Sequence, residues 1–432
     1  MSLSVASFRY RRRVVDDELD ALLGSLAAIS IEGAKAVGKT ATASQRARTV
    51  YELDEPNQRS LAEADLDRLL EGERPVLIDE WQRVPASWDK VRRAVDDPDT
   101  PPASYLLTGS AGLPPDATTH SGAARIVTLR MRPLTLAERG VETPTVSLAE
   151  LLTGCREPLT GETRVRLSDY AEEILASGFP GLRALDGRAL RAQLDGYIAR
   201  ITERDFPDQG HAVRNPAALR RWMTAYAAAS STTASFEKIR DAATGGHGEK
   251  PSRPAVGPYR DILERLWILD PIPAWAPTRS HLRRLASPPK HQLVDPALAA
   301  RLLGVGIGAL LDGEETTPAI PRDGTFLGAL FESLVTLDVR VYAQAAEARV
   351  GHLRSFAGEH EIDLIVERDD ARVVAIEVKL AATVDDDAVR HLRWLQDRLG
   401  TDLLDAIVIT TGSHAYRRPD GIGVVPAALL GP

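Results

Sequence analysis

The sequence contains little cysteine and few aromatic residues. Its 432 residues include one cysteine, Cys155, and aromatic side chains make up 5%. A lone cysteine excludes an intramolecular disulfide and a zinc site built on cysteines, so we expect a reducing, cytoplasmic setting. A signal peptide needs an apolar run after its basic residues, but Asp16, Asp17 and Glu18 follow Arg13 closely. We therefore expect no export.

Long hydrophobic runs are also lacking. The longest apolar stretch, residues 302–311, has ten residues including three glycines, which is about half the length that spans a bilayer. We therefore expect no membrane insertion. The sequence motifs of zinc peptidases (HExxH) and of serine esterases (Gly-x-Ser-x-Gly) are absent as well, which removes support for both classes of hydrolase.

The remaining composition is that of a folded globular protein, with 44% apolar and 26% charged residues. At this length we expect roughly two or three domains. A net charge of −8 argues against a surface that binds polyanions throughout. The charge is uneven, however, because residues 211–300 hold 13 Lys and Arg against 7 Asp and Glu. This basic segment is a candidate contact for DNA.

Predicted strands and helices alternate over residues 1–145. The segments expected as strands are apolar and lie at 28–31, 50–53, 75–78, 104–107 and 125–129. Polar or amphipathic segments expected as helices, among them 61–70, separate these strands. This alternation predicts an α/β domain with a parallel sheet.

A phosphate-binding motif follows the first predicted strand and opens a helix. It reads Gly33-Ala34-Lys35-Ala36-Val37-Gly38-Lys39-Thr40 and matches Gly-x4-Gly-Lys-Thr. In such a loop the backbone N–H groups cradle phosphates, Lys39 reaches the β and γ phosphates, and the Thr40 hydroxyl binds Mg²⁺. The motif predicts ATP and Mg²⁺ as ligands. The alternative, a fortuitous glycine turn, is much weaker in this context.

Two carboxylates end a later apolar strand. Asp79 and Glu80 follow Val76-Leu77-Ile78 and are interpreted as a Walker B element. In that element Asp79 holds the metal ion through water and Glu80 polarises the attacking water. The alternative is a strand that ends in solvated acids, and the phosphate-binding loop favours the catalytic interpretation. A blander hypothesis, nucleotide binding with negligible turnover, makes Glu80 structural.

Further residues are predicted to complete this site. Thr108 follows the strand at 104–107 and is a candidate contact for the γ-phosphate or the lytic water. The candidates for the basic residue that stabilises the transition state are Arg125, Arg130 and Arg132. If Arg125 acts on a neighbouring copy, the chain forms a homo-oligomer.

On these residues, the chain resembles the AAA-type ATPases of bacteria and archaea that carry a conserved C-terminal domain of unknown function. The matching positions are Tyr10, Arg13, 33–40, Leu53-Asp54, 77–82, Val84-Pro85, 107–110, 122–125 and 133–138. The resemblance covers nearly the whole chain and implies an AAA-type P-loop fold. It places an arginine finger at Arg125, although Ala124 stands where the family has glycine.

The middle of the chain, residues 146–275, is expected to be helical. Segments 217–229, 235–243 and 254–269 resemble the helices of a winged-helix module, which can place a helix in the major groove of DNA. In the ATPases that the chain resembles, this region also packs as a lid. A linker is predicted over 276–322. Its basic side chains are interpreted either as phosphate contacts or as a solvated loop, and they are Arg279, His281, Arg283, Arg284, Lys290 and His291.

Residues 323–432 are predicted to form a separate α/β domain with the element order αβββαβ. Asp363 lies on one predicted strand, and Glu377 and Lys379 share a face of the next. Two carboxylates that share a divalent cation beside a lysine form the chemistry of the restriction-endonuclease-like fold. Glu332, on the preceding helix, is a candidate fourth member. The competing interpretation is an exposed ion pair on an edge strand.

The resemblance implies the same nuclease-like core, with Glu332, Asp363, Glu377 and Lys379 at matching positions and Asp363 and Glu377 as metal ligands. Two functions then stay open beyond ATP binding. The first is a magnesium-dependent ATPase coupled to a nuclease that acts on DNA. The second is an ATP-dependent switch whose C-terminal domain recognises a partner without cutting it.

Overall fold

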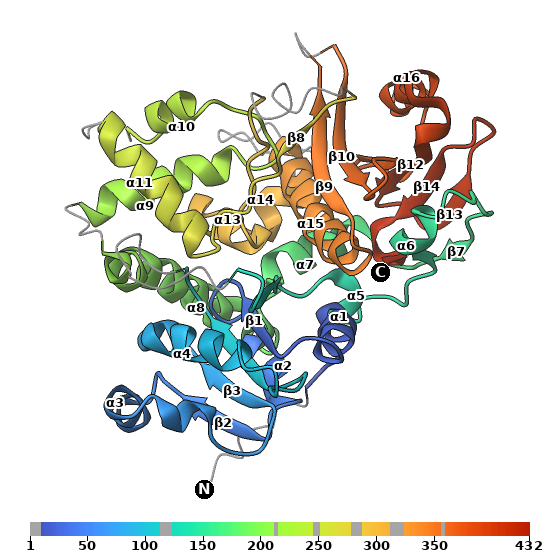
Figure 1. Cartoon of the computed structure of the whole chain (residues 1–432). Coiled ribbons are helices and arrows are strands. Elements are labelled where there is room, and N and C mark those ends of the chain that lie inside the picture. Colours follow the sequence, from blue (N-terminus) through green and yellow to red (C-terminus); the bar gives the residue numbers. More distant parts are fainter. Residues whose placement is uncertain are drawn as a thin grey trace, which may run out of the picture. The chain divides into compact units, whose positions relative to one another are not determined.

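The protein, seen here in a computed structural model, forms two compact units, Met1–Met131 and Arg132–Pro432 (Figure 1). The structure describes residues 10–112, 123–210, 215–244, 251–277, 287–311, 324–355 and 359–432. Within these ranges, every helix is too short or too polar to cross a bilayer.

The first unit is built on a parallel sheet. Its strands are β1 (Ala28–Glu32), β2 (Thr49–Glu52), β3 (Val76–Asp79), β4 (Tyr105–Gly109) and β5 (Val127–Arg130). They run in the order β2-β3-β4-β1-β5, and every neighbouring pair is parallel. This confirms the parallel α/β sheet expected from the sequence. The central strands β3 and β4 are buried along their whole length, as parallel strands covered on both faces are.

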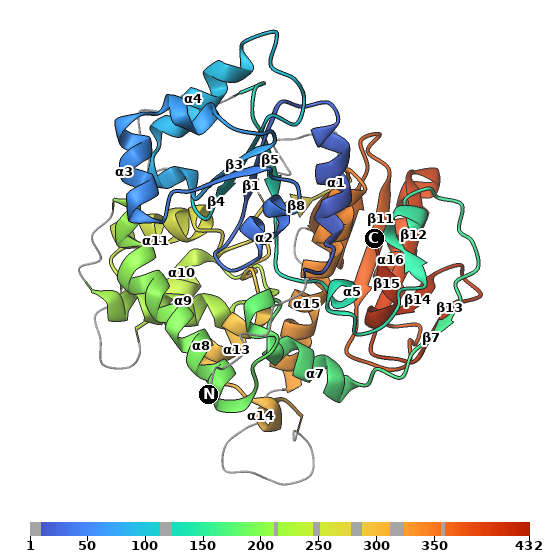
Figure 2. The same ribbon diagram turned by 90° about the horizontal axis from the view of Figure 1, so that it is seen from below.

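Helices cover both faces of this sheet. They are α1 (Val14–Leu23), α2 (Lys39–Ser44), α3 (Pro56–Ala64) and α4 (Ala86–Val95). Figure 2 shows α3 and α4 on one side of the sheet and α1 on the other. The helix predicted over 61–70 is wrong in its bounds. Asp65 adopts an extended conformation that ends α3, and a short 3-10 helix, Asp67–Leu70, follows.

The second unit begins with a set of helices. They are α5 (Leu136–Arg139), α6 (Leu148–Leu151), α7 (Leu167–Ala176), α8 (Gly187–Arg200), α9 (Pro216–Ala228), α10 (Phe236–Ala242), α11 (Arg253–Arg265), α13 (Pro296–Leu303) and α14 (Ile307–Leu311). Side-chain caps fix several helix starts, because Asn215 accepts from the backbone N–H of Ala218 and Ser235 from that of Lys238. Helices α9, α10 and α11 lie where three helices were predicted, and their winged-helix identity stays a prediction.

The C-terminal part of this unit is a mixed sheet with two main helices. Its elements are α15 (Gly324–Ala345), β9 (Arg349–Arg354), β10 (Glu361–Glu367), β11 (Val373–Val378), α16 (Arg390–Leu399), β12 (Leu403–Thr410), β13 (His414–Arg417), β14 (Gly423–Pro426) and β15 (Leu430–Gly431). From α15 to β12 the order is the predicted αβββαβ. The restriction-endonuclease-like identity of this fold stays a prediction.

Short strands from earlier in the chain extend this sheet. The eight-stranded order is β7-β13-β14-β12-β11-β10-β9-β8, in which β7 (Gly161–Glu162) and β8 (Ala274–Trp275) form the two edges. In addition, β6 (Val146–Ser147) pairs with β15. The structure therefore places these three segments, predicted as part of the helical region, in the sheets of the C-terminal part.

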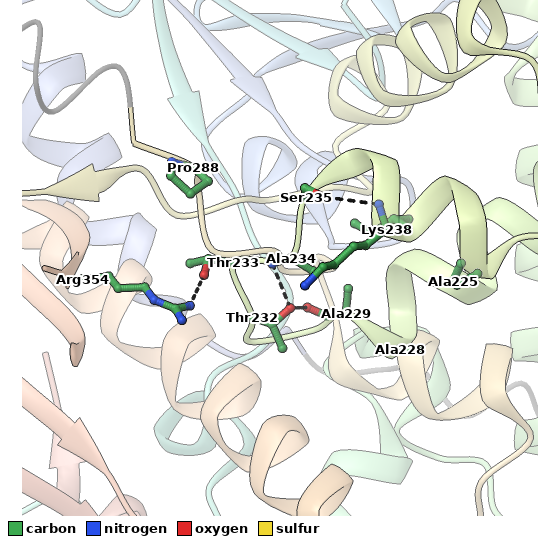
Figure 3. A pocket seen from close by; sticks show the side chains of 12 residues that line it. Ala225, Ala228, Ala229, Thr232, Thr233, Ala234, Ser235, Lys238, Pro288 and Arg354 are labelled. Carbon is green, nitrogen blue, oxygen red and sulfur yellow. Dashed lines mark hydrogen bonds between the residues drawn. The ribbon is translucent and has the colours of Figure 1, made fainter. Parts of the chain in front are cut away.

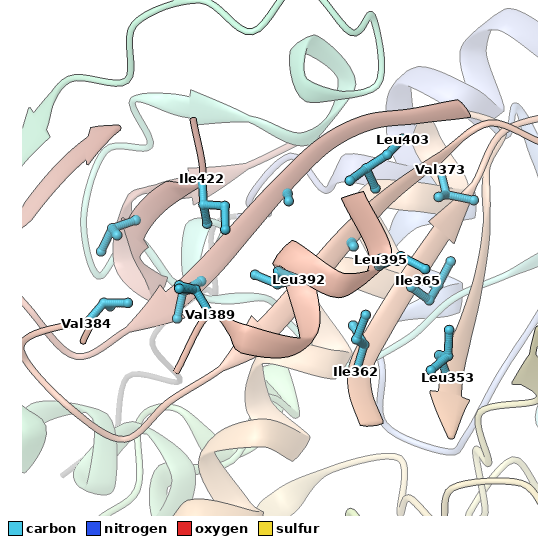
Figure 4. Close-up of a cluster of buried hydrophobic side chains, with 14 of the residues drawn as sticks. Leu353, Ile362, Ile365, Val373, Val384, Val389, Leu392, Leu395, Leu403 and Ile422 are labelled. Carbon is cyan, nitrogen blue, oxygen red and sulfur yellow. The ribbon is translucent and has the colours of Figure 1, made fainter. Parts of the chain in front are cut away.

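Helix α16 packs on one face of the sheet and closes a hydrophobic core (Figure 4). Leu392 and Leu395 of the helix are fully buried with Ile362 and Ile365 of β10. The pairing of β9 with β10 shifts its register between those two isoleucines. Such an irregularity redirects a side chain locally, and Asp363 lies inside it. The core thus holds β10 and β11, which carry the predicted carboxylates, in fixed positions.

Candidate functional site

Three strand ends of the first unit meet at one edge of its sheet. Strand β4 lies between β1 and β3, and parallel strands present their carboxyl ends at the same edge. The loop after β1, the acids that end β3 and the hydroxyls that end β4 are therefore neighbours. The hydroxyl Oγ1 of Thr40 donates to Asp79 Oδ1 at 2.7 Å, and Thr108 donates to the same oxygen.

Two backbone carbonyl groups of the phosphate-binding loop hold the Lys39 side chain. The Lys39 ammonium donates to the carbonyl oxygens of Gly33 and Ala34, both at 2.9 Å. Burial lowers the pKa of Lys39 to about 8, against the opposing effect of the nearby Glu80 and Asp79 carboxylates. Gly38 has a φ of 103°, which glycine adopts readily, and it precedes the first residue of α2.

The other residues of the loop divide by exposure. Ala34 and Val37 are buried, Lys35 is half-buried, and Ala36 is exposed with a φ of 67°. The N-terminal segment supports the loop from outside. Arg13 is buried and donates from Nη1 to the Val37 carbonyl at 2.9 Å, which fixes one side of the loop. Sequence reasoning gave this arginine no role of its own.

Asp79 and Glu80 differ in their surroundings. Burial raises the pKa of Asp79, as does the charge of Glu80, while the hydrogen bonds from Thr108 and Thr40 lower it. Glu80 adopts a left-handed conformation with φ 53° and ψ 45°. A non-glycine residue rarely takes this conformation, and such residues cluster at functional sites.

A set of hydrogen bonds orients the Glu80 carboxylate. Ser110 Oγ donates to Glu80 Oε2 at 2.8 Å, and the amide of Gln82 donates to the same oxygen. The backbone N–H of Glu80 donates to Thr108 Oγ1 at 3.3 Å. The sequence analysis missed Gln82 as an orienting residue. The amide reaches back to Glu80 because of the left-handed conformation of that residue, which the sequence does not show.

The residues at the strand ends fit a magnesium ion. Thr40 and Asp79 offer a hydroxyl and a carboxylate that already touch, and both are the hard oxygen donors that Mg²⁺ takes. Magnesium in nucleotide sites usually keeps several waters and binds substrate phosphates, so one or two protein carboxylates suffice. Among the described residues, no group of three or more His, Cys, Asp or Glu side chains suited to a metal occurs.

The candidate arginines have different surroundings. Arg125 donates from Nε to Asp96 Oδ1 at 2.7 Å, and both side chains are exposed. Its role as an arginine finger stays a prediction. Arg132 is wrong as a candidate, because its guanidinium is buried and donates to Asp270 at 2.7 Å. Arg130 lies near Glu32. Burial raises the pKa of Glu32 above its ordinary value, and the positive charges of Lys39 and Arg130 offset part of this rise.

Close packing under the loop gives a prediction for Gly33→Ala. A Cβ at this position would lie 2.1 Å from the carbonyl oxygen of Met131, a backbone atom that cannot swing away. The loop must therefore shift, and displacements of about 1 Å cost up to about 100-fold in well-positioned sites. We expect at least about tenfold weaker ATP binding, measured by fluorescence titration with a labelled nucleotide.

Gly257→Ala serves as the matched control for that substitution. A Cβ there meets no described atom within 4 Å, so nucleotide binding should stay at its wild-type value, and the melting temperature should stay the same or rise slightly because alanine favours the helix. Unchanged binding in Gly33→Ala would contradict the positioning described for the loop.

A second cluster of charged side chains lies in the Arg132–Pro432 unit. It contains the four residues predicted from the sequence, Glu332, Asp363, Glu377 and Lys379, and it adds Lys290. The Lys290 ammonium donates to Glu332 Oε1 at 2.8 Å and to Asp363 Oδ1 at 3.0 Å. The Lys379 ammonium donates to Glu377 Oε2 at 2.9 Å. The structure thus brings the predicted set together around two ammonium groups.

The carboxylates of this cluster have shifted pKa values. Burial alone would raise the pKa of Asp363, but Lys290, Lys379 and the Val378 N–H outweigh it, and the pKa lies below its ordinary value. Burial and the charge of Asp363 raise the pKa of Glu377 well above its ordinary value. The same two causes raise the pKa of Glu332 to about 8.

A cation of the protein itself already lies between Glu332 and Asp363 of this second cluster. An ammonium lies between Glu332 and Asp363, where a metal ion bound by these carboxylates would have to be. Asp363, one of the two predicted metal ligands, is therefore paired with a lysine in place of a metal ion.

The basic linker side chains need a correction. Arg279, His281, Arg283 and Arg284 lie outside the described residues. Lys290 and His291 are buried, so the prediction that they contact phosphates at the surface is wrong. Lys290 faces carboxylates, and His291 packs its ring against Tyr226 and Phe236 while Nε2 lies 2.6 Å from the Ala234 carbonyl oxygen.

A cavity of about 690 Å³ opens beside α9 and α10 (Figure 3). Its walls are mainly alanine side chains together with Ile239 and Pro288. Lys238 and Arg354 bring positive charge to it, and the hydroxyls of Thr232, Thr233 and Ser235 add polar groups. Arg354 donates to the Thr233 hydroxyl. Sequence reasoning did not single out this cavity.

Comparisons with known proteins identify the first unit. Residues 26–139 match the family described as an AAA domain. Residues 167–307 and 327–430 match two families, each described as a domain of unknown function (DUF8612 and DUF4143). With the loop, the parallel sheet and the strand-end acids, the first match supports an AAA-type P-loop domain in this part of the chain.

Solved structures and curated sequences add little. The Walker-type ATPase of Pyrococcus abyssi is similar at 15% identity, with 68% of this chain and 96% of that chain covered and a TM-score of 0.38. Among curated proteins, no sequence matches the chain.

Proposed function

We propose that the chain is a magnesium-dependent ATPase. One observation carries the proposal, the contact at 2.7 Å between the Thr40 hydroxyl and Asp79 Oδ1. It joins the end of the phosphate-binding loop to the end of β3, which is the arrangement that binds Mg²⁺ beside a nucleotide phosphate. The AAA-domain match over residues 26–139 supports the same function.

The residues of the site take separate roles in this proposal. Lys39 exchanges its bonds to the Gly33 and Ala34 carbonyls for bonds to phosphate oxygens. Thr40 and Asp79 hold Mg²⁺, which supplies positive charge at the β and γ phosphates. Glu80, oriented by Ser110 and Gln82, accepts a hydrogen bond from the water that attacks the γ-phosphate. Thr108 keeps Asp79 and Glu80 in register.

Removal of the metal tests this function. With excess EDTA we expect phosphate release from ATP to fall to the background of a protein-free solution, because charge on the transferred phosphoryl group is then uncompensated. Added MgCl₂ should restore the full rate. A rate that is the same in EDTA and in Mg²⁺ would contradict the proposal, and a malachite-green assay for phosphate measures it.

We further propose that the second unit recognises an anionic partner, with DNA as the first to test, and does not cut it. Exposed Lys238 and the Arg354 side chain, set among hydroxyls at the cavity, favour binding of an anion. Cleavage is not favoured, because Asp363, one of the two predicted metal ligands, already pairs with the Lys290 ammonium. The nuclease hypothesis therefore ranks second.

Stimulation by nucleic acid discriminates these two ideas. We expect DNA, double-stranded or single-stranded, to raise the ATP hydrolysis rate, and Lys238→Ala to weaken this effect while the unstimulated rate stays the same. Supercoiled plasmid should remain intact in ATP and Mg²⁺. Nicking that disappears in Glu377→Gln would instead establish the nuclease function.

A further inference from the structure

Lys290 is a lysine that folding has removed from water. Its side chain has 0% of its surface exposed. Its backbone is fixed as well, because the Lys290 N–H donates to the Ile272 carbonyl and the Ile272 N–H donates to the Lys290 carbonyl, each at 2.9 Å. Lysine is almost never fully buried unless it is paired, so the partners of this ammonium account for its position.

The ammonium finds three oxygen acceptors. They are Glu332 Oε1 at 2.8 Å, Asp363 Oδ1 at 3.0 Å and, more weakly, the Asp363 carbonyl at 3.4 Å. An ammonium group has three N–H donors and accepts nothing, so these acceptors use its full capacity. They come from helix α15 and from β10, an interior strand of the sheet.

We propose that Lys290 is the resident cation of this carboxylate cluster and that it keeps divalent metal ions out of it. A metal ion bound by Glu332 and Asp363 would have to occupy the place of the ammonium. The second ammonium, that of Lys379, pairs with Glu377, so an added divalent ion would also meet a second positive charge nearby. Cations that share a small buried site repel each other strongly.

The lysine has a structural consequence beside the exclusion of metal. It anchors its own segment to α15 and β10, while the next residue, His291, packs between the rings of Tyr226 and Phe236 on α9 and α10. Residues 290 and 291 thus join the helical part of this unit to its sheet. The ion pairs of Lys290 therefore connect these two parts at the position where the sequence pattern predicted a metal centre.

Binding of Mn²⁺ to the full-length chain, followed by electron paramagnetic resonance without nucleotide, tests the proposal. An Asp79→Asn background removes the carboxylate ligand of the predicted magnesium site at the end of β3. In that background we expect no bound Mn²⁺ at millimolar concentrations. Lys290→Met in the same background should bind one Mn²⁺, and the further change Asp363→Asn should abolish this binding.

Two controls make the outcome specific. Lys290→Arg keeps a cation in place and should bind no Mn²⁺, and Lys379→Met, which leaves Lys290 intact, should not create a site of comparable affinity. One Mn²⁺ bound while Lys290 is present and lost in Asp363→Asn would overturn the proposal, and this result does not depend on the folding of any Lys290 variant. A folded Lys290→Met chain without bound Mn²⁺ would overturn it as well.

Discussion

Lys39→Ala is expected to weaken ATP binding by about 10- to 100-fold and to reduce hydrolysis to background. The Lys39 ammonium is held by two loop carbonyls at the point where the β and γ phosphates are predicted to lie. Charge-assisted hydrogen bonds contribute about 1.5–3 kcal/mol each, which corresponds to that loss in affinity. Isothermal titration calorimetry with ATP and Mg²⁺ measures the binding, and phosphate release measures the rate.

Lys90→Ala is the matched control for this substitution. Lys90 belongs to the same unit, on α4, where it forms an ion pair with the exposed Asp67. Ion pairs of this kind contribute about 0–1 kcal/mol, so this variant should bind and hydrolyse ATP as the wild type does. Wild-type affinity in Lys39→Ala would show that the loop does not hold the phosphates.

Glu80→Gln is expected to separate binding from hydrolysis. The substitution keeps the size of the side chain but removes the carboxylate that accepts from Ser110 and Gln82. A positioned general base contributes about 10²- to 10⁴-fold in rate. We therefore expect phosphate release to fall by about that factor while ATP affinity changes less than about threefold.

Bound nucleotide recovered from the purified variant gives the most sensitive measurement. Glu80→Gln should retain ATP, whereas the wild type should retain ADP or no nucleotide after incubation with Mg²⁺. Glu63→Gln, an exposed acid on α3, is the control and should behave as the wild type. An unchanged rate in Glu80→Gln would make Glu80 structural and would favour nucleotide binding with negligible turnover.

Much of the first unit was predictable because its signals are local. The loop from Gly33 to Thr40 is contiguous, and its backbone performs the binding, so eight residues specify the site. The apolar runs before Asp79 and Thr108 are equally short and direct, and the observed strands lie within about two residues of the predicted ones. The loop after β1 and the carboxyl ends of β3 and β4 then lie together because these strands are parallel neighbours in the sheet.

Other features depend on contacts between distant residues, which no local pattern contains. Lys290 was grouped with neighbouring basic residues as a surface segment, but its partners Glu332 and Asp363 lie 42 and 73 residues further along the chain. Because Lys290 is buried beside these carboxylates, its ammonium pairs with them and does not contact phosphate at the surface. Gln82 was missed for a smaller reason, because the left-handed conformation of Glu80 that lets the amide reach back is not visible in the sequence.

The predicted boundary between the helical region and the C-terminal domain was also inaccurate, because it too depends on contacts between distant residues. Strands β7 and β8 are two residues each, too short for a period-two pattern to identify. They join the C-terminal sheet through backbone pairing with β13 and β9. Hydrophobic periodicity along the sequence does not identify two-residue strands that pair with the edge of a sheet formed by distant residues.

A single-turnover measurement tests the central claim most directly. The full-length chain, in excess over radiolabelled ATP, is mixed with Mg²⁺, and the nucleotide is separated and counted over time. The account predicts that bound ATP becomes ADP and phosphate on the protein, and that Glu80→Gln holds it as ATP. If the wild type binds ATP fully and returns it unchanged, the site is not an ATPase.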